Sequence, residues 1–156
     1  MSNVLIAYFS ASGVTARVAK EMADAVGAGL FEIKPVHPYT ADDLNWRDRN
    51  SRSSVEMNDP NCRPAIAQPV ENIDRYETVM IGFPIWWYVE PRIVDTFLES
   101  GDFSGKTMIP FATSGGSDIG RAEKSLKEHC PNAKWKKGRL LNGSGAAVWA
   151  KQVLDE

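Results

Sequence analysis

The chain has 156 residues, of which 43% are apolar and 24% are charged, and its formal net charge is −2. This length suits a single domain with its own core, and the charge excludes the basic field that nucleic-acid binding requires. No apolar run approaches the ~20 residues of a membrane span, no basic leader is visible, and Cys62 and Cys130 form no Cys-x-x-Cys pair. We therefore expect a cytoplasmic protein that contacts neither nucleic acid nor membrane.

The chain opens with a strand, a short polar turn and a helix. Residues 4–9 are β-branched and apolar, as in a strand buried on both faces. Residues 14–27 place apolar side chains at steps of four, and Gly27 is well placed to end that helix. Residues 30–33 are typical of a short second strand.

The turn between the first strand and the helix, residues 10–15, combines hydroxyl side chains with one glycine. Ser10, Ser12 and Thr15 can hydrogen-bond an anion, as can the first N–H groups of the helix, which lack intrahelical partners. The chain has no Gly-Lys-Ser/Thr triplet and no run of three spaced glycines here, so the nucleoside-triphosphate and dinucleotide loops are excluded. Two interpretations stay open: a phosphate socket, or an ordinary helix capped by Ser10 or Ser12.

A long connection follows the second strand, from residue 35 to residue 77. It carries Tyr39, Trp46 and many charged side chains, and several prolines follow in its second half. Thr40 is placed to cap a helix that would run to about residue 55. The length favours a lid or wall rather than a simple linker, and a solvated crossover helix is the alternative.

Residues 78–83 predict the third strand, and an aromatic loop follows it. The loop reads Pro84, Ile85, Trp86, Trp87 and Tyr88. Aromatic side chains are costly to leave in water, because burial contributes about 25 cal/mol per Å² of apolar surface. They either plug the core or a partner surface, or flank a flat heteroaromatic ring. We expect Glu90, just before Pro91, to be a solvated carboxylate at the start of a helix.

The fourth strand is predicted over residues 106–113, although Pro110 weakens it. Its loop reads Thr113, Ser114, Gly115, Gly116 and Ser117, and the two glycines allow backbone to approach the edge of a planar ligand. Three further helices are predicted: one that begins at Pro91, one over residues 119–130 and one over residues 145–154. A weaker strand is predicted over residues 139–141.

Strands and helices therefore alternate along the whole chain. This alternation predicts an α/β fold with a five-stranded parallel sheet and helices on both faces. Ligands of such sheets bind at the carboxyl ends of the strands, over the switch point between the first and third strands. The three loops follow the first, third and fourth strands, so we expect them to converge at that edge.

Taken together, the three loop motifs resemble those of short-chain flavodoxin-like proteins with Pro-Ile-Trp-Trp and Thr-Ser-Gly-Gly signatures, and the likeness spans residues 3–142. The resemblance implies one flavodoxin-like domain over residues 1–156, a three-layer sandwich of strand order 2-1-3-4-5, with the insertion-like connection at 35–77. It also implies one non-covalent FMN. The phosphate contacts would come from Ser10, Ala11, Ser12, Gly13, Val14 and Thr15. The ring contacts would come from Pro84, Ile85, Trp86, Trp87 and Tyr88 on one side, and from Thr113, Ser114, Gly115, Gly116 and Ser117 on the pyrimidine side.

In such a protein FMN does the chemistry, so no side chain is assigned as catalytic. Two redox functions stay open: an electron carrier with a redox protein partner, or an NAD(P)H-dependent oxidoreductase that reduces quinones or similar small acceptors. The modest net charge argues against a carrier that docks electrostatically, because such a carrier has a large acidic excess. The lack of an evident second nucleotide site argues against the oxidoreductase. A flavin-free scaffold for protein binding is a third possibility, against which the phosphate loop argues. His37 and His129 have no partner cluster in the sequence, so no metal ligand is assigned.

Overall fold

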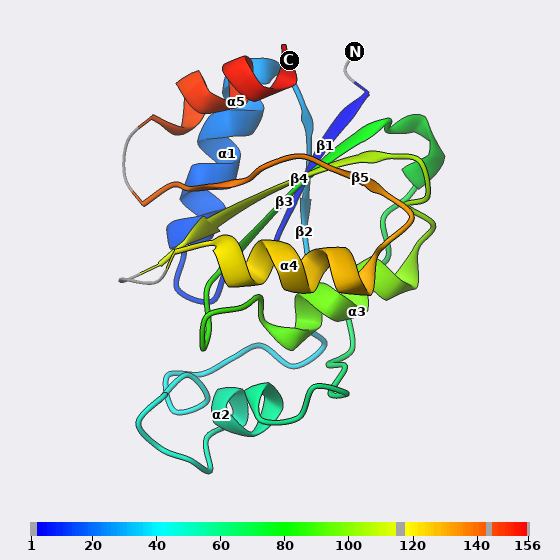
Figure 1. Ribbon diagram of the computed structural model, residues 1–156. Coiled ribbons are helices and arrows are strands. Elements are labelled where there is room, and N and C mark those ends of the chain that lie inside the picture. The colour runs from blue at the N-terminus through cyan, green and yellow to red at the C-terminus, as the bar shows by residue number, and fades with distance from the viewer. Residues whose placement is uncertain (1–2, 115–117, 143–144, 156) are drawn as a thin grey trace.

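The computed structural model describes residues 3–114, 118–142 and 145–155. Its centre is a parallel sheet with the strand order β2-β1-β3-β4-β5, in which β6 also pairs with β4 (Figure 1). The strands are β1 (Val4–Tyr8), β2 (Gly29–Glu32), β3 (Thr78–Pro84), β4 (Thr107–Thr113), β5 (Lys134–Trp135) and β6 (Arg139–Leu140). The predicted order is confirmed, and the switch point lies between β1 and β3.

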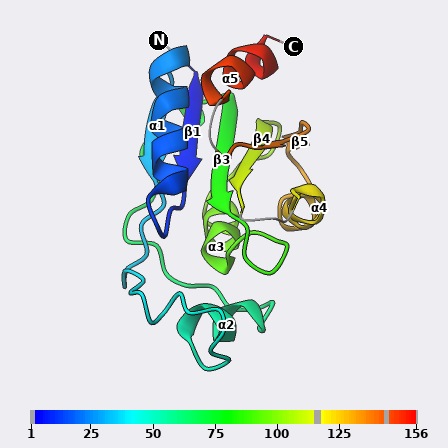
Figure 2. The same ribbon diagram turned by 90° about the vertical axis from the view of Figure 1, so that its left-hand side faces the viewer.

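Helices cover both faces of the sheet, which makes the predicted three-layer sandwich (Figure 2). α1 (Val14–Val26) and α5 (Ala146–Leu154) pack on one face, and α3 (Arg92–Ser100) and α4 (Gly120–His129) pack on the other. Side chains alternate along β1, so that Ile6 joins the α1 and α5 core and Leu5 joins the α3 and α4 core. Within the described part of the chain, every helix is too short or too polar to cross a membrane.

The last strand differs from the prediction, because two short strands replace the single strand expected over residues 139–141. β5 pairs with Thr107 and Met108, and β6 pairs with Phe111 and Ala112. The gap between them lies beside Pro110, which has no N–H group for a ladder hydrogen bond. Gly138 passes so close to the Pro110 carbonyl that a Cβ atom at this position would clash with it.

The connection over residues 35–77 also differs from the helix expected between residues 40 and 55. Thr40 and Asp43 do form a reciprocal capping pair, with N–H to side-chain oxygen distances of 2.9 and 3.1 Å. The side chains of Asn45 and Asp48 then accept hydrogen bonds from backbone N–H groups two residues ahead, which competes with helical hydrogen bonding. The regular elements of this connection are α2 (Arg52–Met57) and the 3-10 helix η1 (Ile73–Arg75).

α2 lies beyond α3, at the end of the molecule toward which β1 and β3 point (Figures 1 and 2). Arg92, in the first turn of α3, connects the two helices. Its guanidinium donates to the carbonyl oxygens of Met57 at 2.8 Å and Glu56 at 3.3 Å. These are carbonyls at the C-terminus of α2, where a positive charge is favourable.

Candidate functional site

The loop of residues 10–15 leaves the N-terminus of α1 open. The N-cap is Gly13, in the left-handed conformation with φ of +94°, and among the described residues no side chain caps the helix. Ser10 Oγ instead accepts the Gly13 N–H at 3.1 Å, which bends the loop, and the Ser12 side chain is exposed. Neither serine is therefore the helix cap, and the first N–H groups of a 13-residue helix face the loop with the positive end of its dipole.

The hydroxyl of Thr15 does not face solvent as Ser12 does. It is buried and lies 2.8 Å from the hydroxyl of Thr113, at the end of β4. This hydrogen bond connects the loop after β1 to the loop after β4. One of the two hydroxyls accepts in this pair and keeps its own proton to donate elsewhere.

The aromatic loop after β3 ends in a tight hairpin. Trp86 and Val89 exchange both backbone hydrogen bonds, at 2.9 and 3.1 Å, and enclose Trp87 and Tyr88. Both enclosed residues have positive φ, +49° and +74°, the signs of a type I′ turn that normally favours Asn and Gly. This conformation costs a non-glycine residue about 1–2 kcal/mol. Trp87 and Tyr88 are nevertheless 42% and 55% exposed, and the Arg121 guanidinium lies 5.1 Å from the centre of the Tyr88 ring, so the strain is offset by little burial.

Trp86, in contrast, is held in a cluster of three rings. Its ring lies 5.6 Å from that of Phe9 and 5.5 Å from that of Tyr39, both edge to face. Tyr39 donates its hydroxyl to Glu56 Oε1 at 2.5 Å, and the Arg52 guanidinium stacks 3.8 Å from its ring centre. Burial and the Glu56 carboxylate raise the pKa of Tyr39 above its usual range. The long connection is thus packed against the aromatic loop.

The three loops surround a pocket of about 360 Å³ at the carboxyl edge of the sheet, here called the central pocket. Its lining residues are Ser12, Val14, Pro84, Ile85, Trp86, Thr113, Ser114 and Asn142. Asn142 was missed by the sequence analysis, although its place just after the last strand is a usable signal. Its Oδ1 accepts the Ser114 N–H at 2.7 Å.

The other predicted site residues lie around this pocket. Ser10 and Ala11 line a neighbouring pocket of about 310 Å³ together with Tyr39. Trp87 and Tyr88 line a third pocket of about 370 Å³, the Trp46 pocket, whose walls are Trp46, Ile85, Trp86, Trp87 and Tyr88. Gly115, Gly116 and Ser117 lie outside the described residues.

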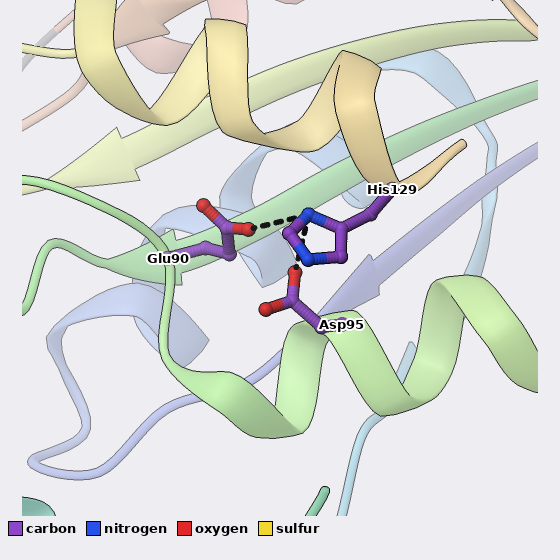
Figure 3. A group of neighbouring side chains, drawn as sticks. All are labelled: Glu90, Asp95 and His129. Carbon is purple, nitrogen blue, oxygen red and sulfur yellow. Dashed lines mark ion pairs between the residues drawn. The ribbon is translucent and has the colours of Figure 1, made fainter. Parts of the chain in front are cut away.

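Glu90 is not the solvated carboxylate that we expected, because its side chain is completely buried. The chain passes from the aromatic hairpin straight between α3 and α4, which brings Glu90 beside Asp95 and His129 (Figure 3). Burial, reinforced by the neighbouring Asp95 carboxyl, raises the pKa of Glu90 to about 10. The carboxyl is therefore protonated at neutral pH when no further positive charge is present.

Comparisons with known proteins agree with this architecture. A presumed flavoprotein from Bacteroides eggerthii is 52% identical, with a TM-score of 0.94, and the match covers 99% of this chain and 97% of that one. A second presumed flavoprotein, from Bacteroides uniformis, is 53% identical with a TM-score of 0.92, and the match covers 99% of each chain. No match was found among curated proteins.

A more distant structure, a flavoprotein in complex with FMN from Lactobacillus acidophilus, is 19% identical with a TM-score of 0.74. That match covers 90% of this chain and 93% of the other, and it shows a shared fold. The family model described as flavodoxin matches residues 3–155. With this match, and with the sheet order that the structure shows, the chain belongs to the flavodoxin family.

Proposed function

We propose that this protein binds one FMN at the central pocket and acts as an electron-transfer flavoprotein. The observation that carries the proposal is the convergence of the loops after β1, β3 and β4 on one pocket beside an uncapped helix N-terminus. The flavodoxin family, and the distant relative that was crystallised with FMN, point to the same cofactor.

The residues present fit the phosphate of FMN. The exposed Ser12 hydroxyl and the open N–H groups at the start of α1 are donors for an anion, and the helix dipole adds about 0.3–1 kcal/mol when exposed. Gly13 supplies the left-handed turn that aims these groups at one point. No lysine is needed in such a socket.

The residues present also fit the flavin ring. Ile85 and Trp86 give the central pocket an apolar wall. Ser114 and Asn142, which are hydrogen-bonded to each other, give it a polar wall. The strained hairpin holds Trp87 and Tyr88 in exposed positions, where a bound ring would give them a packing partner. When bound, FMN supplies the redox chemistry; the chain holds its phosphate, flanks its ring and keeps water from one face.

A Ser12→Ala variant tests the phosphate socket. A hydrogen bond to a charged group contributes about 1.5–3 kcal/mol, so we expect FMN affinity to fall about 10- to 150-fold. Riboflavin lacks the phosphate, and its affinity should change less than about twofold. Affinities are measured by quenching of tryptophan fluorescence in flavin-free protein.

Ser104→Ala is the matched control, because Ser104 is exposed and lies just before β4, at the opposite edge of the sheet. It should bind both flavins like the wild type. Equal losses of FMN and riboflavin affinity in Ser12→Ala would contradict the socket. A wild-type chain that does not bind FMN would end the proposal as a whole.

The Trp46 pocket favours a second candidate function, an NAD(P)H-dependent oxidoreductase that reduces quinones or similar small acceptors. This pocket shares Ile85 and Trp86 with the central pocket, so an aromatic acceptor bound there would lie next to the flavin. Anaerobic mixing of the FMN-loaded protein with NADPH separates the two functions. Fast two-electron bleaching of the flavin by NADPH, together with slower quinone turnover in Trp46→Ala, supports the oxidoreductase. The absence of a reaction with NADPH supports the carrier.

A further inference from the structure

A second group of chemically active side chains lies behind the aromatic loop, between α3 and α4 (Figure 3). Glu90 ends the loop, Asp95 lies in the first turn of α3, and His129 is the last residue of α4. His129 Nδ1 lies 3.5 Å from Asp95 Oδ1 and 3.7 Å from Glu90 Oε2. One atom from each of the three residues lies within 4.8 Å of the other two.

The two carboxyl groups are buried without enough partners. Both side chains are 0% exposed, and Ser125 Oγ donates to Glu90 Oε2 at 2.8 Å. Within the described part of the chain, Glu90 Oε1 and both oxygens of Asp95 have no hydrogen-bond partner. Buried polar atoms are nearly always hydrogen-bonded. A proton held between Glu90 and Asp95 supplies one hydrogen bond between them, which leaves the second Asp95 oxygen without a donor and gives the place room for a ligand.

A positively charged ligand suits this place. The nearest described guanidinium, that of Arg92, is 3.9 Å from Asp95 Oδ2 and already donates to two backbone carbonyls of α2. A divalent cation would balance the two carboxylates, and these would then be ionised together.

We propose that Glu90, Asp95 and His129 bind one divalent transition-metal cation, for which Zn²⁺ is the probe. Ligand atoms 2.0–2.1 Å from a tetrahedral Zn²⁺ lie about 3.3–3.4 Å from one another. The two distances from His129 Nδ1, 3.5 and 3.7 Å, need to shorten by only a few tenths of an ångström. A set of one imidazole and two carboxylates suits zinc, manganese or iron and disfavours the soft cations that prefer thiolates.

The histidine can exchange its proton for the cation. Without metal, Nδ1 lies 2.8 Å from the Ser125 carbonyl oxygen, which requires an N–H donor at Nδ1. On binding, the neutral imidazole changes tautomer: solvent takes the Nδ1 proton and supplies one to Nε2, and the Nδ1 lone pair then binds the cation. The carbonyl oxygen then lies beside the cation as a further oxygen donor. The His129 side chain is 22% exposed, which provides an entry path.

A bound cation would have a mechanical role. It would connect three elements, the end of the aromatic loop, the start of α3 and the end of α4, at a point behind the hairpin. The site is separate from the central pocket, because none of its three ligands lines that pocket. The proposal is therefore independent of flavin binding.

Equilibrium dialysis of the flavin-free full chain against Zn²⁺ at neutral pH, after treatment with a chelator, tests the site. The wild type should bind one Zn²⁺ per chain and should melt at a higher temperature with the ion than with excess chelator. His129→Gln should lose at least tenfold in affinity, and Asp95→Asn should do the same with nearly unchanged shape. His37→Gln removes the other histidine, which is exposed, and should bind like the wild type.

Zn²⁺ also binds thiolates, so Cys62→Ser is the second control and should retain the ion. The proposal is overturned if the wild type binds no stoichiometric Zn²⁺, if His129→Gln binds it as tightly as the wild type, or if Cys62→Ser loses it. Should both ligand variants fail to fold, the chelator-dependent melting temperature of the wild type and of Cys62→Ser decides alone: a rise with Zn²⁺ in both supports the site, and its absence in either overturns it.

Discussion

Replacing Tyr39 by Phe removes one hydroxyl from the contact between the long connection and the aromatic loop. The hydroxyl donates to Glu56 Oε1 at 2.5 Å, and Arg52 donates to Glu56 Oε2 at 3.0 Å, a contact that the substitution does not remove. A hydrogen bond to a charged group contributes about 1.5–3 kcal/mol, and we expect the free energy of unfolding to fall by that amount. For a chain of this size the melting temperature should then fall by about 3–12 °C. The ring remains, so its contact with Trp86 and the affinity for FMN should be retained.

Urea unfolding of the flavin-free protein, followed by far-UV circular dichroism, measures the loss. A double-mutant cycle with Glu56→Gln isolates the coupling between the two side chains, which should account for most of it. Tyr76→Phe is the matched control, since the Tyr76 hydroxyl donates no hydrogen bond within the described residues and its removal should cost less than about 0.5 kcal/mol. A Tyr39→Phe loss below about 0.5 kcal/mol, or a cycle without coupling, would refute the reasoning.

Gly82→Ala should destabilise the protein by about 1–3 kcal/mol in the same unfolding assay, because the new Cβ would overlap the buried Phe111 ring. In the control Gly101→Ala the new Cβ makes only ordinary contacts, so stability should change by less than about 0.5 kcal/mol. Equal effects of the two substitutions would argue against the overlap. The double variant Trp87→Asn with Tyr88→Gly places residues that tolerate positive φ at both positions. The free energy of unfolding of the flavin-free protein should therefore rise by about 1–2 kcal/mol, while FMN should bind more weakly. Unchanged stability in that variant would show that the hairpin is not strained.

The sheet and the positions of its loops could be predicted because their signals are local. Residues 78–83 are apolar on both faces, which only a buried central strand explains, and the polar turn at residues 10–15 directly precedes an amphipathic helix. Since parallel strands share one carboxyl edge, the convergence of three loops followed from their order alone. Asn142 follows the last strand, so the same rule places it at this edge, but a lone asparagine has no pattern that assigns it a contact there.

The surroundings of Glu90 could not be predicted, because they depend on residues far apart in the sequence. A Glu-Pro pair at a helix start carries no local signal of burial, and here the packing of α4 on α3 encloses Glu90 with His129. The helix expected after Thr40 failed for a different reason. Asn45 and Asp48 satisfy backbone N–H groups locally, and propensity alone does not reveal which of the competing hydrogen bonds will form.

The long connection between β2 and β3 costs the fold little, because the entropy of closing a flexible loop grows only with the logarithm of its length. Doubling such a loop costs about 0.6 kcal/mol, less than one good hydrogen bond. Changes in the length of residues 35–77 would therefore cost the sheet little. Because Tyr39 of this connection packs on Trp86, such changes would alter the surroundings of the exposed aromatic loop.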